Sequence, residues 1–369
     1  MRPVPGGFSG VLANGVFLHS CAKRAIHPHS LESAAPHDRN RGTIACMPSK
    51  KPTPAQRLVA LLQIRILTRD DLRAGAMDTH AITAAVRAGT LIRLRRGRYV
   101  AHEVAADVSE AVRIGGRLAC VSLLQLIGIF VLENPGLHVQ VSPRLSRFRH
   151  RRSPGATLHW TDCVHPSAEH AVSVWDAVRQ SIRCQEPRAA IATLDSVLHH
   201  RILTHEQVVA VFESLPHRFR ALLPLLDPSA ESGPETFVRL LLRTLGLPYD
   251  TQVTVPGVGR VDFVVCGWLI IECDSREFHE GWDSQVADRA RDIAAARQGY
   301  VTIRPLAADI FTRPNEVKTA IKEVVETLGP LLGDRRKPQL RRNRRFGGAN
   351  RPSGRRSARS SGVAAKKSG

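Results

Sequence analysis

The sequence contains few cysteines, and their spacing matches neither a local metal-binding module nor a disulfide framework. Seven cysteines occur in 369 residues, and no C-x-x-C pattern is present. Their number is odd and the intervals between them are irregular, so neither a zinc module nor a set of paired disulfides is favoured. This cysteine usage indicates a reducing cytoplasm. The cysteines lie at positions 21, 46, 120, 163, 184, 266 and 273.

Long apolar runs are also missing. The longest, Leu126–Leu132, contains a glycine and is far shorter than the roughly 18 residues that a transmembrane helix needs. We therefore expect a cytoplasmic protein that does not insert into a membrane. The length of the chain predicts two or three domains with a sizeable core.

Acidic residues are scarce relative to basic ones. The chain has 53 lysines and arginines against 33 acids, for a formal net charge of +20. Thirteen of these basic residues lie between positions 334 and 369, where Asp334 is the single acid. This composition predicts a disordered basic tail at 331–369 that contacts phosphates without sequence preference. The charge predicts a polyanionic partner, most simply duplex DNA, although an anionic membrane surface would attract it equally.

The N-terminal part changes character after residue 46. Residues 1–46 show no clear periodicity, and we expect an extension without a fold. Three short helices are then expected at 54–64, 68–74 and 78–88, followed by two strands around residues 95–97. Three small helices and a basic hairpin are typical of a winged helix-turn-helix, which we predict for residues 47–104.

The predicted DNA contacts of this unit lie on its third helix and its hairpin. The third helix would enter the major groove, where His80 and Thr83 could reach base edges, and the hairpin would act as the wing. The alternative is that the hairpin arginines form only a solvated face. The arginines predicted to bind DNA are Arg93, Arg95, Arg96 and Arg98.

The end of this unit carries a family resemblance. Residues 89–100 read G-T-L-I-R-L-R-R-G-R-Y-V, and residues 54–101 resemble the N-terminal domain of AbiEi-type antitoxins of type IV toxin–antitoxin systems. The resemblance implies sequence-directed DNA binding, often to the protein's own promoter, and a toxin as a possible partner. Whether the chain forms a homodimer is left open.

The middle of the chain, residues 105–230, is predicted to be mixed α/β at first and helical later. An apolar helix is expected at 116–129, and strands at 137–141 and 156–160. Between the strands, the basic loop 144–152 contains one aromatic residue and could contact nucleic acid or simply be solvated. Four helical segments are expected at 173–183, 187–199, 204–214 and 218–226.

Three acids interrupt the apolar pattern of the C-terminal part. Two short strands, 261–265 and 268–271, flank the turn signal Cys266-Gly267. Asp262 lies within the first strand, and Glu272 and Asp274 follow the second. Simple antiparallel pairing across this turn would bring Asp262 close to Glu272. Clustered carboxylates suit Mg²⁺ or Mn²⁺, whereas any single acid would more simply be solvated or paired with an arginine.

This stretch carries a second resemblance. The patterns R-V-D-F, I-I-E-x-D, F-H, D-R-x-R-D and G-Y-V-T-I-R follow in order, and residues 231–328 resemble the endonuclease-like domains related to very-short-patch-repair (Vsr) enzymes, within the PD-(D/E)XK group. The resemblance implies that Asp262 and Glu272 bind metal and that Asp274 occupies the slot of the usual lysine. The missing lysine, and Ser275 in place of a glycine, depart from the pattern.

Other residues of this part have predicted roles in the same chemistry. His279 could be a general acid or base, since its ordinary pKa lies near neutrality. Arg289 and Arg291 could hold a phosphate. Glu235 forms a capping box with Ser232, while the resemblance implies that an acid at this place completes the metal site.

Together these features predict an α/β chain with three parts: a winged helix-turn-helix, a mixed α/β to helical middle region, and a restriction-endonuclease-like domain at 231–330. The expected function is Mg²⁺- or Mn²⁺-dependent hydrolysis of phosphodiester bonds in DNA. The alternative is a transcriptional regulator of the antitoxin kind without catalysis. A weaker third possibility is an RNA-binding factor that depends on the basic tail.

Overall fold

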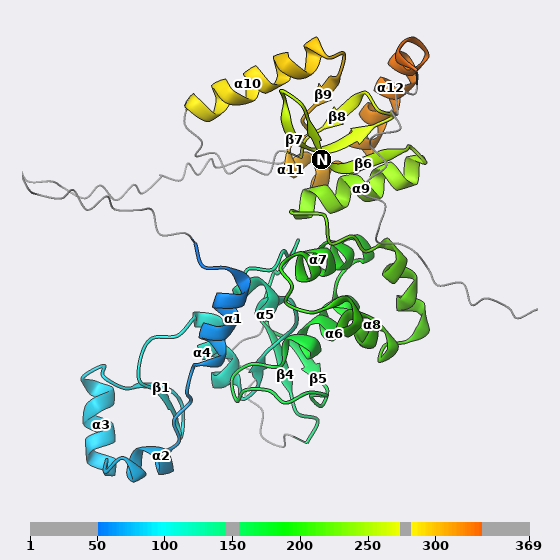
Figure 1. The fold of residues 1–369 in the computed structure, drawn as a ribbon. Helices are drawn as coiled ribbons and strands as arrows, with labels where there is room; N and C mark the ends of the chain where they lie inside the picture. The colour runs from blue at the N-terminus through cyan, green and yellow to red at the C-terminus, as the bar shows by residue number, and fades with distance from the viewer. Residues whose placement is uncertain (1–50, 145–154, 274–281, 334–369) are drawn as a thin grey trace, which may run out of the picture. The chain divides into compact units, whose positions relative to one another are not determined.

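The computed structural model describes residues 51–144, 155–273 and 282–333, without the side chains of 282–285. Within these ranges the chain is mixed α/β, with small sheets of two, three and four strands (Figure 1). No helix in the same ranges is long and apolar enough to cross a membrane. The mixed α/β class expected from the sequence is therefore confirmed.

The first described segment contains the three expected helices and the hairpin. Thr68 and Asp71 form the expected capping box, and Asp78 caps the third helix. Leu72, Ile82, Leu91 and Tyr99 make a small core of their own, since their side chains are almost completely buried. The elements are α1 (Pro54–Leu62), α2 (Arg69–Ala74), α3 (Thr79–Arg87), β1 (Ile92–Arg95) and β2 (Arg98–Val100).

The middle region begins with a three-stranded sheet in the order β3-β4-β5, in which β4 is antiparallel to β3 and parallel to β5. The helix expected at 116–129 is present but shorter: it spans Cys120–Leu126, and Arg117–Leu118 form a strand before it. Gly115, at φ 107°, ends a preceding helix, and a Cβ at Gly116 would lie 2.3 Å from Val139 Cγ1, so the chain passes tightly beside β4 before the next helix begins. The elements are α4 (Ala106–Ile114), β3 (Arg117–Leu118), α5 (Cys120–Leu126), β4 (His138–Val141) and β5 (Thr157–Trp160).

The second half of the middle region is helical, as expected. The helices are α6 (Val174–Cys184), α7 (Pro187–His199), α8 (His205–Glu213) and the 3₁₀ helix η2 (His217–Leu225). The helical segment expected at 218–226 is present as the 3₁₀ helix η2. Pro224 lies inside it and has no N–H to donate, which disfavours regular α-helical hydrogen bonding there.

The C-terminal part contains a four-stranded sheet, β6-β7-β8-β9, between helices (Figure 1). The first three strands are antiparallel, and β9 runs parallel to β8. One face packs with α9, α11 and α12 in a core that includes Phe263 and Ile271, while Val264 and Ile270 pack with Ala295 of α10 on the other. The elements are α9 (Gly233–Leu245), β6 (Tyr249–Val255), β7 (Gly259–Val265), β8 (Leu269–Ile271), α10 (Trp282–Arg297), β9 (Val301–Ile303), α11 (Ala307–Thr312) and α12 (Pro314–Leu332).

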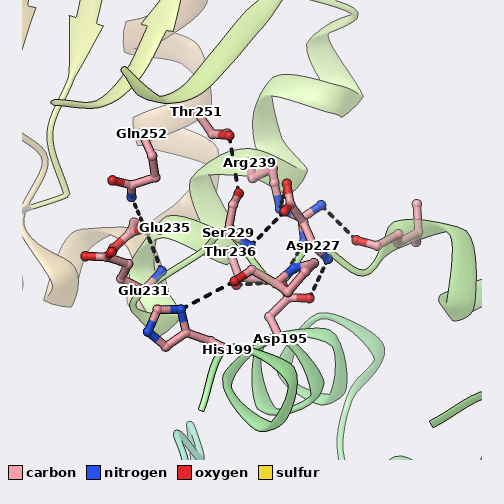
Figure 2. Close-up of polar contacts among 12 residues, drawn as sticks. Asp195, His199, Asp227, Ser229, Glu231, Glu235, Thr236, Arg239, Thr251 and Gln252 are labelled. Carbon is pink, nitrogen blue, oxygen red and sulfur yellow. Dashed lines mark hydrogen bonds and ion pairs between the residues drawn. The ribbon is translucent and has the colours of Figure 1, made fainter. Parts of the chain in front are cut away.

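A buried ion pair joins α7 to α9. Arg239 Nη2 donates a 2.7 Å hydrogen bond to Asp195, and Nη1 donates one of equal length to the carbonyl of Leu225 (Figure 2). Asp195 also accepts bonds from the Thr236 hydroxyl at 2.8 Å and from the Asp227 N–H at 2.7 Å. Burial raises the pKa of Asp195 to about 6 even though Arg239 opposes the shift. This network anchors α9, whose first turn contains Glu235.

Candidate functional site

The two acids expected to meet across the β7–β8 hairpin do meet. Phe263 pairs with Ile271, and one step further along the same antiparallel register Asp262 lies opposite Glu272. The backbone N–H of Cys273 donates a 2.8 Å hydrogen bond to the Asp262 carboxylate. The hairpin register therefore places both acids at the same end of the sheet, where the charge of Asp262 acts on Glu272.

The surroundings of Asp262 disfavour its charge. Burial raises its pKa above the ordinary value, and the nearby charge of Glu231 adds to this. Hydrogen bonds from the Cys273 N–H and the Gln252 side chain act in the opposite direction. The positive charge of Arg260 also lowers the pKa, but burial outweighs these effects and the pKa of Asp262 stays raised.

Glu272 differs because two arginines contact it. Burial raises its pKa, and Arg304 and Arg291 lower it, while the charge of Asp262 raises it again. The Glu272 carboxylate lies 2.9 Å from Arg291 Nη2 and 3.5 Å from Arg304 Nη2, and the side chain is 13% exposed. The pairing of an acid with arginine, considered from the sequence, is therefore present at Glu272, but the partners come from α10 and from the end of β9.

Glu235 lies in the first turn of α9 and is 5% exposed. Its carboxylate accepts hydrogen bonds from the Glu231 N–H at 2.9 Å, the Ser232 hydroxyl at 2.8 Å and the Gln252 side chain at 2.7 Å (Figure 2). Burial raises its pKa to about 7, and the charge of Asp262 contributes to that rise. Glu235 thus caps its helix and also belongs to the same group of acids.

Gln252 on β6 connects two of the acids. Its amide donates to Glu235 at 2.7 Å and hydrogen-bonds Asp262. Its backbone φ of 52° lies in the left-handed region, which is strained for a residue with a side chain. No pattern in the sequence points to this residue, because a glutamine in an otherwise ordinary strand has no distinctive spacing.

Cys273 is a buried cysteine whose pKa is affected by Asp262, Glu235 and Glu272. It is 7% exposed, and its pKa is raised well above the ordinary value, first by burial and then by the charges of Asp262, Glu235 and Glu272. The charges of all three acids therefore act in the same direction on the pKa of one buried thiol. The raised pKa keeps this thiol protonated, so it is a poor nucleophile.

The two arginines predicted to hold phosphate have different surroundings. Arg291 is held internally: it donates to Glu272, to the carbonyl of Arg260 at 2.7 Å and to the carbonyl of Val258 at 3.0 Å. Arg289 is exposed on α10. Of the remaining predicted site residues, Asp274 and His279 lie outside the described residues.

The oxygen donors of this site suit a hard cation, but the three acids do not form a compact group of donor atoms among the described residues. Carboxylate oxygens are the ligands that Mg²⁺ and Mn²⁺ prefer, and a cation would favour the charged forms of Asp262 and Glu235. Across the described residues, only Cys120, His138, His159 and Cys184 form a group of three or more donor atoms within 4.8 Å of one another. This second group was not predicted from the sequence, since its members are far apart along the chain.

The predicted DNA-binding arginines of the β1–β2 hairpin are not equivalent. Arg93 and Arg96 are exposed, whereas Arg95 and Arg98 are half-buried. Arg98 forms an ion pair with Glu169 and donates to the carbonyl of Gly97 at 3.1 Å. Arg98 is therefore held within the fold, while Arg93 and Arg96 point charge into solvent.

Helix α3 has an exposed polar face. His80 and Thr83, the residues expected to reach base edges, are both exposed and line a shallow surface hollow together with Thr79 and Arg87. Ile82 on the opposite side of the helix is buried in the small core. The helix thus presents hydrogen-bonding side chains and a positive charge on one accessible face.

Comparisons with known proteins identify a distant relative and no family. No protein-family profile matches the chain. The chain is 28% identical over 271 residues to the uncharacterized protein Rv2248 of Mycobacterium tuberculosis (strain ATCC 25618 / H37Rv), and to its counterpart MT2308 in strain CDC 1551 / Oshkosh. The similarity covers 66% of this chain and 96% of the relative.

Proposed function

We propose that this chain is a DNA-acting, metal-dependent endonuclease-like protein of the cytoplasm. Residues 231–330 would hydrolyse phosphodiester bonds, and residues 47–104 would dock the chain on duplex DNA. The observation that carries the proposal is the antiparallel register that sets Asp262 opposite Glu272, with Gln252 hydrogen-bonded to the buried Glu235 beside them. The charge of Asp262 raises the pKa of both Glu235 and Glu272. Buried carboxylates of like charge are costly to a fold, and a bound cation would offset that cost.

Asp262, Glu272 and Asp274 would hold Mg²⁺ or Mn²⁺, with Glu235 as a supplementary ligand. When bound, the cation supplies an activated water and neutralises charge on the phosphate. Gln252 orients Glu235 and Asp262 through its amide, and Arg291 and Arg304 position Glu272. His279 would be the group that transfers a proton to or from the reacting oxygens.

The exposed side of α3 and the β1–β2 hairpin support the docking role. His80 and Thr83 offer hydrogen-bonding groups for base edges, and Arg93 and Arg96 offer charge for phosphates. The basic composition of residues 334–369 adds contacts that depend on salt but not on sequence. Partial burial of Arg98 against Glu169 removes it from this set.

The experiment that tests the function is nicking of supercoiled plasmid with Mg²⁺, with Mn²⁺ or without an added divalent cation. Wild type is compared with Glu272→Gln and with the control Glu323→Gln, which changes an exposed glutamate of α12. We expect cation-dependent nicking by wild type and the control, and its loss in Glu272→Gln. Equal nicking by all three proteins would mean that the activity does not arise at this site.

One observation favours the second candidate, a DNA-binding regulator of the antitoxin kind that does not cleave. Glu272 already has two arginine partners, so it is neutralised without a metal, and the lysine typical of the nuclease group is absent. Tight binding to duplex DNA without nicking in any cation would favour the regulator. In that case α3 and the β1–β2 hairpin would be the functional surface, and a toxin would be the partner to seek.

A further inference from the structure

A group of two cysteines and two histidines lies in the middle region, away from the carboxylates. Cys120, His138, His159 and Cys184 each offer one donor atom, and these four atoms all lie within 4.8 Å of one another. His138 Nδ1 is 3.1 Å from His159 Nε2, and Cys184 Sγ is 3.8 Å from the same nitrogen. None of these residues takes part in the proposed cleavage or in DNA docking.

Four different elements bring the donors together. Cys120 is the first residue of α5, His138 the first of β4, and Cys184 the last of α6. His159 is on β5, whose parallel register with β4 pairs His138 with Thr157, two residues before it. Because side chains alternate along a strand, His138 and His159 therefore project from the same face of the sheet.

The local structure holds this arrangement in place. Cys120 adopts a φ of 51°, a left-handed conformation that costs a residue with a side chain roughly 1 kcal/mol or more. Two residues later, the Ser122 hydroxyl accepts a 2.9 Å hydrogen bond from the N–H of His138, which ties the start of α5 to the start of β4. Strained backbone conformations of this kind persist where the surrounding structure holds the residue in place, and they are concentrated at functional sites.

The distances match those of a tetrahedral metal site. With Zn–N of about 2.0–2.1 Å and Zn–S of about 2.3 Å, the edges of a tetrahedron are roughly 3.3 Å between two nitrogens and about 3.6 Å between nitrogen and sulfur. The measured 3.1 Å and 3.8 Å lie close to these values. A hydrogen bond between two imidazoles explains the first contact but not why two thiols converge on the same point.

We propose that Cys120, His138, His159 and Cys184 bind one Zn²⁺ ion that serves a structural role. Two thiolates and two imidazoles complete the coordination of a closed site, with no position left for a reacting water. Cys120 and His138 are buried and Cys184 is exposed, so the metal can enter from the side of Cys184. The ion would fasten the β4–β5 pair to α5 and α6.

The test is the zinc content of the full-length protein, purified without metal-affinity resin. We expect one zinc per chain in wild type, in the control Cys163→Ser, and in Asp262→Asn, which alters only the carboxylate site. Cys163 is a half-buried free cysteine of the same region outside the group. Cys184→Ser and His159→Asn should weaken zinc binding by more than roughly 100-fold, since even outer partners of a ligand contribute about 10–100-fold.

Cobalt substitution keeps the proposal testable if a variant fails to fold. Wild type loaded with Co²⁺ should give the strong visible absorption of tetrahedral coordination and a thiolate-to-cobalt charge-transfer band. Removal of zinc should also lower the midpoint of thermal unfolding, and re-addition should restore it. A folded wild type with no zinc and no such cobalt spectrum would overturn the proposal. A disulfide between Cys120 and Cys184 in freshly purified protein would overturn it as well.

Discussion

Gln252 donates a 2.7 Å hydrogen bond from its side-chain amide to Glu235 and also hydrogen-bonds Asp262. One neutral side chain thus bridges two acids from different elements, the first turn of α9 and the middle of β7. It does so from a backbone φ of 52°. The strained backbone is explained if holding the amide beside the two acids outweighs the conformational cost at Gln252.

Replacement of Gln252 separates these two effects. Gln252→Gly and Gln252→Ala both remove the amide, but only glycine relieves the left-handed backbone. We expect the glycine variant to be more stable than the alanine variant by about 1 kcal/mol, measured by urea unfolding. Both should nick DNA more slowly than wild type, because Glu235 and Asp262 lose a shared donor. If both nick at the wild-type rate, Gln252 has no positioning role.

Glu235 predicts a pH dependence of stability. Its pKa is raised from 4.5 to about 7 in the folded chain, chiefly by burial. The folded state therefore retains a proton that the unfolded state releases between those pH values, so the contribution of Glu235 to stability falls as pH rises from 4.5 to 7. Over this window the loss amounts to about 3 kcal/mol.

Glu235→Gln should lack this loss, since glutamine keeps the acceptor without the charge. The free energy of unfolding is measured at pH 4.5 and pH 8, without added Mg²⁺ or Mn²⁺. Relative to wild type, the variant should gain stability at the higher pH. Parallel pH profiles for the two proteins would show that folding does not raise the pKa of Glu235.

The buried pair Arg239 and Asp195 predicts a large effect on stability. Arg239→Met leaves Asp195 without its cation and should destabilise the fold by about 3–5 kcal/mol. Arg243→Met is the control, because Arg243 is exposed one turn further along α9. Thermal unfolding of the two variants is compared with wild type. Similar midpoints for Arg239→Met and the control would contradict the anchoring role of this network.

Arginines of the β1–β2 hairpin predict different effects on DNA binding. Arg93→Ala and Arg96→Ala should each weaken binding to all duplexes alike and lower the slope of log affinity against log salt by about 1. Arg98→Ala should change that slope less, since Arg98 pairs with Glu169. Titrations at several salt concentrations measure the slopes. An equal change in all three variants would mean that Arg98 also reaches phosphate.

The face of α3 makes a separate prediction about sequence preference. His80→Ala and Thr83→Ala should relax discrimination among duplex sequences by about 1–3 kcal/mol at the bases they contact. The salt slope should stay close to that of wild type, because neither change removes a positive charge. Binding selection on a random duplex pool measures the preference. An unchanged selected sequence in both variants would argue against α3 as the reading helix.

Local features of the fold could be predicted from the sequence because their causes are local. The capping residues Thr68 and Asp78 and the turn at Cys266-Gly267 are properties of a few neighbouring residues. Two-residue periodicity then sufficed to pair Asp262 with Glu272. The capping pattern correctly predicted the contact of Glu235 with Ser232, whereas the metal-site role that the family resemblance implies for Glu235 stays a proposal.

Features that arise only in the folded chain escaped prediction. The arginine partners of Glu272 come from α10 and the end of β9, and no local pattern connects them. The zinc group consists of Cys120, His138, His159 and Cys184 on separate elements. Its successive members are 18, 21 and 25 positions apart, so the group has none of the short spacings of a zinc module. The helix expected at 116–129 begins only at Cys120. Its start was not predictable because the close approach of Gly116 to Val139 is a tertiary contact.

The rate at which Asp262→Asn nicks supercoiled plasmid in Mn²⁺ tests the central proposal most directly. Asparagine keeps the shape of Asp262 and an oxygen for the Cys273 N–H, but it lacks the charge that a cation needs. We expect the rate to fall by about 100-fold or more relative to wild type, with the thermal midpoint nearly unchanged or raised. Nicking by Asp262→Asn at the wild-type rate would contradict a nuclease site at these carboxylates.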